Sequence, residues 1–513
     1  MASHAAKPTA GHAAEPAAGP GGASAEDIRT TGEATTTGWT TAWELLLPAV
    51  AAPARSRGRA LQEALREAVR SGRLASGTRL PASRALAADL GVSRGLVTEA
   101  YEQLTAEGYL RAGRGAGTWV GGAVAVATGA GSRRGAPPRG REDRLTLLPG
   151  VPDLSLFPRS AWSAAQRAVL AELPHATLGY PDPRGLPRLR TTVAQMLARR
   201  RGVVADPERV VVCSGVSQAM TLLGLVLYAG GQRTVAAEDP GSPEHAELFA
   251  HSGMRTVRVP LDEEGPDLGM LRAAGVRTLV ATPSHQFPSG LAYSPARRAQ
   301  LLDWARSVDG LVIEDDYDGD FRYDRAPVGA LQGLDPDHVA YTGSVSKSLA
   351  PGMRLGWMVV PERLADAVVA RKRLMDLGNP ALDQETLARF IEHGAYDRHL
   401  RRCLRTYRER RNALVEALAE HLPGTEVSGI AAGLHVIAAL PPGDTPGPEL
   451  VERAAEAGLA VRLLDAYTAQ AAGDGRVRLV IGYAALAPYR IDEAVRLLAR
   501  VVANGRQAAP GAR

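Results

Sequence analysis

The sequence predicts two domains of different architecture: a small helical module that ends in a β-hairpin, and a larger α/β domain with a mostly parallel central sheet. The first prediction rests on two short, capped helices separated by a tight turn within residues 80–110. The second rests on short β-branched runs that alternate with helical stretches from about residue 145 to 505. A chain of 513 residues is too long for one ordinary core, which agrees with this division.

The N-terminal residues 1–38 are rich in alanine, glycine and proline, and we expect a disordered tail. They have no apolar segment behind a basic start, so a secretory signal is not expected. Apolar runs such as residues 222–229 fall well short of the ~20 residues that span a bilayer. Only Cys213 and Cys403 are present, neither at metal-ligand spacing, and a cytoplasmic protein is expected.

Residues 39–120 are predicted to form a winged helix-turn-helix. Apolar positions recur at helical spacing in residues 57–71, and Ser83 and Ser93 are predicted to cap the two helices that follow. Residues 109–120 are predicted to form a two-stranded hairpin, the wing, because their glycines permit a tight turn between apolar ends.

Positive charge is concentrated in this module. The chain carries a net charge of +5, and residues 55–120 hold eleven arginines, no lysine and six acids, so this window contains the whole excess. A basic module on a near-neutral body indicates a polyanionic partner, here double-stranded DNA. A solvated charged surface and a small protein-interaction domain are the alternatives.

The geometry of a winged helix-turn-helix selects the residues that would contact DNA. The start of the second capped helix, with Ser93, Arg94 and Thr98, is expected to face the major groove, and Arg114 and the Gly115 backbone would meet the adjacent groove. The stretches LPASRALA, GVSRGLV, AYEQLTAEGYL and GRGAGTWV resemble the DNA-binding domain of the GntR family. The resemblance implies a set of DNA-contacting positions: Arg84, Arg94, Thr98, Arg114 and Gly115.

Residues 121–144 are low in large apolar side chains and rich in glycine, alanine, proline and arginine, which predicts a flexible linker. In residues 145–505 the runs RVVVC, RTLVAT and GLVIED are predicted strands, and the stretches that begin at Ser217 and Pro295 are predicted helices. No glycine-rich dinucleotide motif follows a strand, and no P-loop motif is present. A nicotinamide dinucleotide or P-loop nucleotide site is therefore not expected.

The predicted strand at 310–315 ends in acids and a tyrosine, at the edge of the sheet where α/β proteins bind ligands. A magnesium cluster is one interpretation, although we expect no metal. The other interpretation joins this strand end to Lys347, in GSVSKSLAPGMRLGW. Lysine can lose its proton and attack a carbonyl carbon, whereas arginine cannot.

Together these groups describe a site for pyridoxal 5′-phosphate (PLP). A carboxylate can keep the cofactor's ring nitrogen protonated, a tyrosine can bond its phenolic oxygen, and a lysine can form an imine with its aldehyde. Serines, an arginine and a helix N-terminus can hold its phosphate. Gly215, Val216 and Ser217 would supply that helix N-terminus.

Several segments of the body resemble fold-type I PLP enzymes of the aminotransferase class: YPDPRG, CSGVSQA, AEDPG, TPSHQFPSG, IEDDYD and the lysine segment. The resemblance implies that Lys347 is the Schiff-base lysine and that Asp315 pairs with the pyridine nitrogen. It also implies that Tyr317 bonds the phenolic oxygen, and that Ser344 and Arg354 hold the phosphate.

Other positions imply a dimer or depart from the enzyme pattern. Tyr180 resembles the tyrosine that reaches the phosphate of the neighbouring subunit's cofactor, which implies a homodimer. Ser242 follows the Asp-Pro-Gly turn where many relatives carry a stacking aromatic, and Phe287 replaces a frequent asparagine. The arginine for a substrate or effector carboxylate is expected at Arg478, with Arg476 as the alternative.

A GntR-like module, a linker and an aminotransferase-like body together resemble the MocR/GabR family of bacterial transcription regulators. The resemblance implies a PLP-dependent DNA-binding regulator that senses PLP or an amino compound through an aldimine at Lys347. The alternatives are a catalytically active aminotransferase with an appended winged-helix module, and a DNA-binding protein whose body has lost its cofactor.

Overall fold

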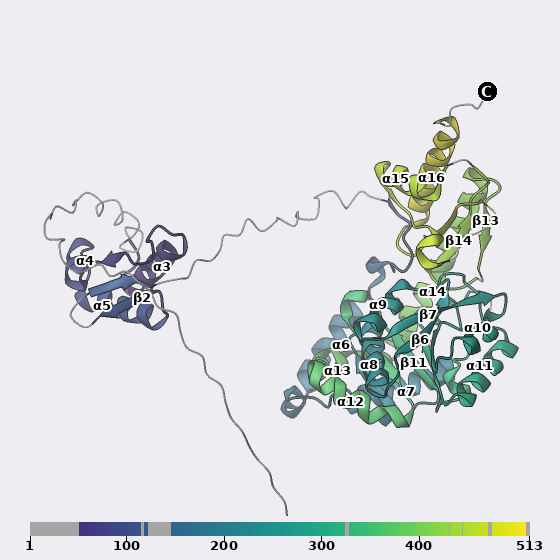
Figure 1. The fold of residues 1–513 in the computed structure, drawn as a ribbon, viewed down its shortest axis with the longest axis horizontal. Helices are drawn as coiled ribbons and strands as arrows, with labels where there is room; N and C mark the ends of the chain where they lie inside the picture. The colour runs from purple at the N-terminus through teal and green to yellow at the C-terminus, as the bar shows by residue number, and fades with distance from the viewer. Residues whose placement is uncertain are drawn as a thin grey trace, which may run out of the picture. The chain divides into compact units, whose positions relative to one another are not determined.

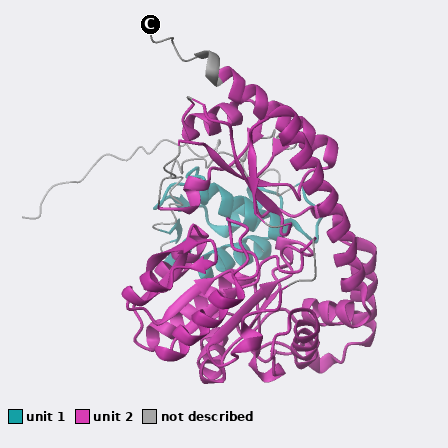
Figure 2. Ribbon diagram, turned by 90° about the vertical axis from the view of Figure 1, so that its right-hand side faces the viewer, with its two compact units in different colours: residues 1–138 teal, residues 139–513 magenta. Residues whose placement is uncertain are grey.

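The computed structural model describes residues 51–113, 117–121, 145–323, 328–429, 431–443, 445–469 and 475–508. The chain divides into two compact units, residues 1–138 and 139–513 (Figure 2), and each is described by itself. The predicted tail at 1–38, and the predicted linker beyond Gly121, lie outside the described residues.

The first unit has the predicted winged helix-turn-helix architecture (Figure 1). Its helices are α3 (Arg57–Arg70), α4 (Ser83–Asp89) and α5 (Arg94–Ala106), and they bury one apolar cluster that includes Leu61, Leu86 and Leu104. Its strands are β1 (Arg79–Leu80), β2 (Leu110–Gly113) and β3 (Gly117–Val120), in the antiparallel order β1-β3-β2. The predicted two-stranded wing therefore gains a third strand, because Arg79 and Leu80 pair with Trp119 and Thr118.

The two short helices begin differently. Ser93 caps α5 as predicted, since its side chain accepts a hydrogen bond from the Leu96 N–H at 3.3 Å. The prediction that Ser83 caps α4 is wrong: Ala82 occupies the cap position, without a side-chain hydrogen bond. Ser83 is already the first helical residue, so its hydroxyl is not placed to accept from the N–H groups of that first turn.

The second unit is built on an eight-stranded sheet in the order β5-β12-β11-β10-β9-β6-β7-β8. Neighbouring strands from β11 to β7 are parallel, whereas β12 and β8 run antiparallel to their partners, so the prediction of a mostly parallel sheet is confirmed. The strands are β5 (Val210–Cys213), β6 (Thr234–Asp239), β7 (Arg255–Asp262), β8 (Gly265–Pro266), β9 (Thr278–Ala281), β10 (Leu311–Asp315), β11 (Val339–Ser344) and β12 (Gly356–Val359).

Helices cover both faces of this sheet (Figure 1). Ile313 of β10 packs in the apolar cluster of α8 and α9, while its neighbour Val312 packs in the cluster of α10 and α11, because successive strand side chains point to opposite faces. Every residue of β5 and β10 is buried, as expected of strands covered on both sides. The helices of this layer are α6 (Arg159–Glu172), α7 (Pro187–Arg201), α8 (Val216–Ala229), α9 (Pro243–His251), α10 (Leu268–Ala273), α11 (Pro295–Ser307), α12 (Glu362–Asp376) and α13 (Ala381–Glu392).

The C-terminal part of the unit forms a smaller layer, which the long helix α14 (Ala395–His421) precedes. Its antiparallel sheet has the order β13-β14-β16, and β15 pairs with β4 at the start of the unit. Within the described residues, no helix is long and apolar enough to cross a membrane. The elements are β4 (Leu145–Thr146), β13 (Glu426–Ser428), β14 (His435–Ala439), α15 (Gly447–Glu456), β15 (Leu459–Ala460), β16 (Arg478–Gly482) and α16 (Pro488–Ala508).

The segment after β4 runs close against β16 because of one glycine. The Gly482 N–H donates to the Leu147 carbonyl at 2.8 Å, and a Cβ at Gly482 would collide with the Leu148 carbonyl. This close approach carries residues 147–151 to the edge of the large sheet, where Leu148 to Val151 line a cleft.

Candidate cofactor site and DNA-binding surface

A cleft of about 400 Å³ opens where β10 and β11 end and α8 begins. Its lining contains most of the residues that the sequence predicted for PLP: Asp315, Tyr317, Ser344, Lys347, Arg354, Val216 and Ser217. They come from segments far apart in the chain, and the parallel sheet brings them to one edge.

Lys347 lies in the turn after β11 and points into the cleft. Its Nζ donates a hydrogen bond to the Gly150 carbonyl at 2.5 Å. Burial lowers the pKa of Lys347 below its ordinary value, although the charges of Asp318 and Asp315 act in the opposite direction. A lowered pKa increases the fraction of unprotonated amine, which is the form that attacks a carbonyl carbon.

Asp315 is the last residue of β10 and is only 8 % exposed. One of its carboxylate oxygens lies 3.0 Å from Nε2 of His245 on α9. Burial works against charge on His245, but the hydrogen bond and charge of Asp315 raise the pKa of the imidazole above its ordinary value. This hydrogen bond holds the Asp315 carboxylate in place at the end of β10. The sequence reading missed His245, although it stands in the first turn of the helix after β6.

Arg354 and the start of α8 form a cradle for an anion. The Arg354 guanidinium donates to the Ser214 carbonyl, and a Cβ at Gly215 would lie 3.1 Å from its Nη2 atom. Gly215 also has a positive φ of 91°, a backbone conformation that favours glycine. No side chain caps α8, whose first N–H groups together with the guanidinium suit a phosphate.

One wall of the cleft is aromatic. Phe287, which replaces the frequent asparagine, meets Tyr317 edge-on with ring centroids 5.8 Å apart. It also meets the rings of His435 and Tyr467, each at 5.1 Å. The Phe287 ring therefore gives this wall of the cleft an apolar surface. Ser242, at the position of the stacking aromatic, also lines the cleft, and its hydroxyl donates to Glu244.

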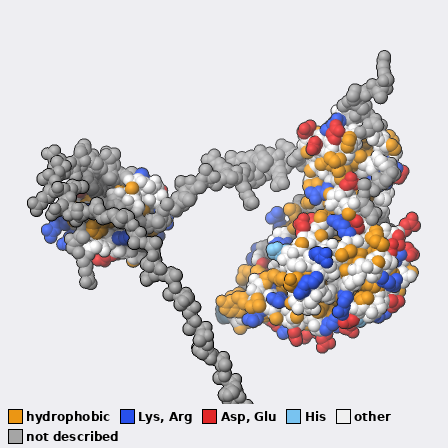
Figure 3. Space-filling view, in the orientation of Figure 1, with side chains coloured by type: hydrophobic (Ala, Val, Ile, Leu, Met, Phe, Trp, Pro, Cys, Tyr) orange, Lys and Arg blue, Asp and Glu red, His pale blue; other side chains and the backbone are white. Residues whose placement is uncertain are grey.

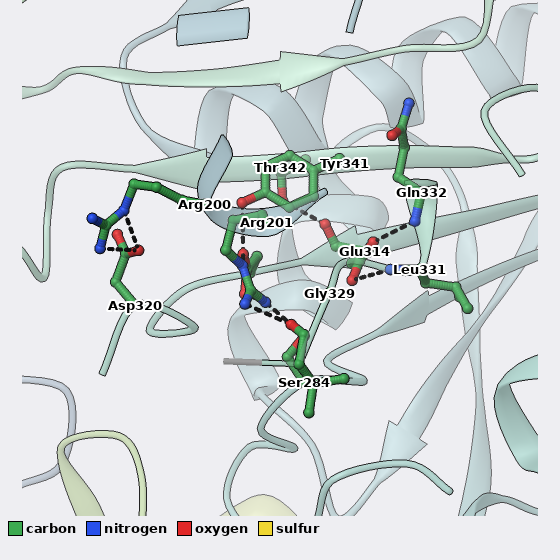
Figure 4. A network of polar contacts seen from close by, with 12 residues as sticks. Arg200, Arg201, Ser284, Glu314, Asp320, Gly329, Leu331, Gln332, Tyr341 and Thr342 are labelled. Carbon is green, nitrogen blue, oxygen red and sulfur yellow. Dashed lines mark hydrogen bonds and ion pairs between the residues drawn. The ribbon is translucent and has the colours of Figure 1, made fainter. Parts of the chain in front are cut away.

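A buried polar network supports the strand end that carries Asp315 and Tyr317 (Figure 4). Arg201 of α7 donates to Asp316 at 2.6 Å and to the Ser284 hydroxyl at 2.8 Å. The Tyr341 hydroxyl donates to the same Asp316 carboxylate at 2.6 Å. The network thus ties α7, β11 and the loop after β9 to the end of β10.

The acids of this strand end are engaged by basic side chains. Asp316 pairs with Arg201, Asp318 lies 2.9 Å from His285, and Asp320 pairs with Arg200 at 2.9 Å (Figure 4 shows the Arg200 pair). These pairs occupy the carboxylates that a magnesium ion would need, which disfavours the magnesium interpretation.

The arginines predicted for a carboxylate lie outside the lining of this cleft. Arg478, at the start of β16, lines a second cavity of about 220 Å³ together with Arg476. Arg476 pairs with Glu426 at 2.5 Å and donates to the Leu440 carbonyl. Arg462, which the sequence reading missed, lines the Lys347 cleft itself.

Tyr180 does not line the Lys347 cleft either. Its side chain is 93 % exposed, on the segment that follows the short helix η3 (His175–Leu178).

The first unit presents the predicted DNA-contacting residues on its surface. Arg84, Ser93 and Arg94 are exposed, and Thr98 is half-buried. Arg94 and Thr98 are four residues apart on α5, so they share one face of this helix. Arg114 and Gly115 lie outside the described residues.

Comparisons with known proteins identify both units. Residues 58–120 match the family of bacterial regulatory proteins of the gntR type, and residues 150–498 match aminotransferase class I and II. The pyridoxine biosynthesis transcriptional regulator PdxR of Corynebacterium glutamicum is 34 % identical over 413 residues, which cover 79 % of this chain and 88 % of the relative. The probable rhizopine catabolism regulatory protein MocR of Rhizobium meliloti is 35 % identical over 386 residues, which cover 71 % of this chain and 77 % of the relative.

A solved structure shares the fold of the second unit. The α-aminoadipate aminotransferase LysN of Thermus thermophilus, in complex with N-(5′-phosphopyridoxyl)-L-leucine, is 29 % identical with a TM-score of 0.62, and the match covers 70 % of this chain and 92 % of that one. The family and the donor set of the cleft support PLP as the cofactor. The chain belongs to the bacterial HTH-type transcriptional regulators in which a GntR-family DNA-binding domain precedes an aminotransferase class I and II domain.

Proposed function

We propose that this regulator binds PLP at Lys347, and that its affinity for operator DNA changes when PLP or a small amino compound occupies the cleft. One observation carries the proposal: Lys347, Asp315 and the Arg354 cradle line a single cleft in a chain that also has a GntR-type module. The named functions of the two relatives, in pyridoxine biosynthesis and rhizopine catabolism, support these two effector classes. The cytoplasm is the proposed location, supported by two buried free cysteines.

Each residue of the cleft has its own role toward PLP in this proposal. Bound PLP supplies an aldehyde carbon that forms a reversible covalent bond with primary amines. Lys347 is the resident amine, Asp315 keeps the ring nitrogen protonated, and Arg354 with the start of α8 orients the phosphate. With Ser242 and Phe287 at positions where enzymes carry a stacking aromatic and an amide, the cleft is better suited to sensing than to rapid turnover.

An anionic effector would need an arginine. The sequence pattern favours Arg478, which we propose for the carboxylate although it lines a separate cavity; Arg462, which lines the Lys347 cleft, is the alternative. The Arg478→Ala variant, loaded with PLP, is expected to respond to amino acids about 10- to 100-fold more weakly, because a charge-assisted pair is worth ~1.5–3 kcal/mol. The response to the matching amines without a carboxylate should not change. Fluorescence anisotropy of DNA selected by the wild-type protein measures both responses.

Arg462→Ala is the matched control for this experiment, since Arg462 lines the Lys347 cleft itself. If Arg462→Ala loses the response to amino acids and Arg478→Ala keeps it, the carboxylate belongs to Arg462. A wild-type protein whose DNA binding ignores PLP and every amine would contradict the sensing proposal.

We also propose that the regulator is a homodimer, supported by an exposed apolar patch on the second unit. Figure 3 shows hydrophobic side chains gathered at the end where Figure 1 places α6, α12 and α13. The exposed side chains include Leu178, Leu374 and Leu377, and the end of α12 touches the segment of Tyr180, since a Cβ at Gly378 would lie 2.9 Å from Pro181. A second copy would cover this patch and bring its own Tyr180.

Leu377→Asp is expected to convert the dimer to a monomer, because a buried charge would lack a partner in the interface. Light scattering of the full-length chain measures the mass. Met270→Asp, which changes an equally exposed apolar residue on α10, should leave the dimer intact. A wild-type chain with the mass of a monomer at micromolar concentration would contradict the proposal of a homodimer.

A further inference from the structure

A chain of hydrogen-bonded side chains ends at Ser214, the residue before the phosphate cradle. The Ser214 N–H donates to Oε1 of Gln218 at 2.7 Å, and Nε2 of Gln218 donates to the Asp376 carboxylate at 2.7 Å. Nζ of Lys372 donates to the same carboxylate oxygen at 2.7 Å. We call Gln218, Asp376 and Lys372 the α12 support, because it runs from α12 through the first turn of α8 to the peptide group in front of Gly215.

The direction of each hydrogen bond in the α12 support is fixed. A backbone N–H can only donate, so the amide oxygen of Gln218 faces Ser214 and its NH2 group faces Asp376. A lysine ammonium can only donate as well. Burial opposes charge on Asp376, but the hydrogen bonds of Lys372 and Gln218 lower the pKa of its carboxyl, which therefore accepts from both. Since none of these groups can exchange donor for acceptor, the contacts define one arrangement.

The innermost member of the support is a fully buried lysine. Lys372 is 0 % exposed and does not line the Lys347 cleft. A buried charge is costly unless it is paired, and a buried pair contributes little net stability even then. The second carboxylate oxygen of Asp376 accepts from the Gly378 N–H at 2.9 Å, so the pair is anchored to the backbone that follows α12. A positional role explains this pair better than a gain in stability does.

Ser214 is held at each of its polar groups. Gln218 accepts from its N–H, and the Arg354 guanidinium donates to its carbonyl. Nδ2 of Asn379 donates to its hydroxyl at 2.9 Å. Asn379 stands three residues beyond α12 and is 2 % exposed. The end of α12 therefore reaches Ser214 twice, once through Asp376 and once through Asn379.

The position of Ser214 sets the geometry of the cradle. Its carbonyl belongs to the same peptide group as the Gly215 N–H, and the Arg354 guanidinium that bonds this carbonyl lies against Gly215. A shift of Ser214 would therefore displace the guanidinium and the first N–H groups of α8 together. Lys347 and Asp315 stand on other elements, after β11 and at the end of β10, so such a shift would affect the phosphate site first.

We propose that Gln218, Asp376 and Lys372 are positioning residues for the phosphate of PLP, which hold Ser214 so that Arg354 and the start of α8 meet the phosphate together. The inference rests on the proposed PLP site. It assigns a role to three residues that do not line the Lys347 cleft.

The test compares the affinity of the full-length protein for PLP with its affinity for pyridoxal, which has the same ring and aldehyde but no phosphate. Each compound is titrated into protein freed of cofactor, and the visible absorbance band gives two dissociation constants. Their ratio measures what the phosphate contributes. Gln218→Met removes both polar ends of the amide at similar length. It is expected to weaken PLP binding about 10-fold, as the loss of one hydrogen bond to a charged group does, and to leave pyridoxal binding unchanged.

An exchange of charge between positions 218 and 376 supplies the rescue. Gln218→Glu alone places two carboxylates side by side and should reduce the preference for PLP at least as much as Gln218→Met. Gln218→Glu/Asp376→Asn has a single carboxylate again, now at position 218, where it accepts from the Ser214 N–H and from the amide at position 376. This double variant should recover a preference close to that of the wild type.

Three results overturn the inference: a wild-type ratio in Gln218→Met, an equal loss of affinity for PLP and pyridoxal, or a double variant no better than Gln218→Glu. The second would indicate general damage to the cleft, and the third would mean that the hydrogen bonds do not act through their direction. A wild-type protein with no band after either aldehyde contradicts the proposed function instead. That result concerns the wild type alone, so the two failures are distinct.

Discussion

Replacing Lys347 by alanine is expected to abolish the visible absorbance band of the protein incubated with PLP, and with it every response of DNA binding to amino compounds. Lys347 is the amine in the cleft, and burial lowers its pKa toward the reactive form. Lys347→Arg should fail in the same way, because arginine keeps the charge but does not act as a nucleophilic amine. Absorbance spectroscopy beside the wild-type protein measures the loss.

Because the chain contains few lysines, the modified lysine can be identified without ambiguity. The chain contains three lysines, Lys7, Lys347 and Lys372, against a large excess of arginine. Lys372 is fully buried and pairs with Asp376 at 2.7 Å, so it is not available to a cofactor. After borohydride reduction, peptide mass mapping should find PLP on Lys347 alone. A band that survives in Lys347→Ala would disprove the assignment.

Replacing Arg94 by alanine is expected to weaken binding to the selected DNA by about 5- to 150-fold, since a base-contacting arginine is worth ~1–3 kcal/mol. Arg94 is exposed at the first position of α5, the helix that would enter the major groove. Its loss should also relax the preference for one base of the site. Anisotropy titrations on matched and single-base-changed duplexes, at one fixed salt concentration, measure affinity and preference together.

Arg73→Ala is the control for charge alone, because Arg73 is exposed just beyond the end of α3 in the same unit. It should weaken binding to all sequences slightly and equally, as a phosphate or long-range contact does. Equal losses in both variants, with no change of base preference, would mean that Arg94 does not read the groove.

The structure brings together in one cleft the predicted residues that stand in contiguous sequence motifs. Asp315, Lys347 and Arg354 stand in short segments at strand ends, and a parallel sheet must bring such ends to one edge. The helix-turn-helix was predictable for a similar reason, since its helices and turns are local.

The remainder depended on contacts between distant segments or on backbone angles. His245, His285 and Gly150 touch the site only because other parts of the fold press them there, and no spacing in the chain encodes those distances. Whether Ser83 or Ala82 caps α4 depends on which of them has helical backbone angles, and both are compatible with the sequence pattern.

The hydrogen bond between Lys347 and the Gly150 carbonyl has a consequence for the connection between the units. Gly150 lies four residues beyond β4, the first described element after the stretch of chain that leads from the DNA-binding unit. Any chemistry that engages the Lys347 amine must release the Gly150 carbonyl. The freed peptide group belongs to the segment that directly follows residues 121–144, the predicted linker. The carbonyl that Lys347 contacts is thus only a few residues beyond β4, although Lys347 itself is 197 residues further along the chain.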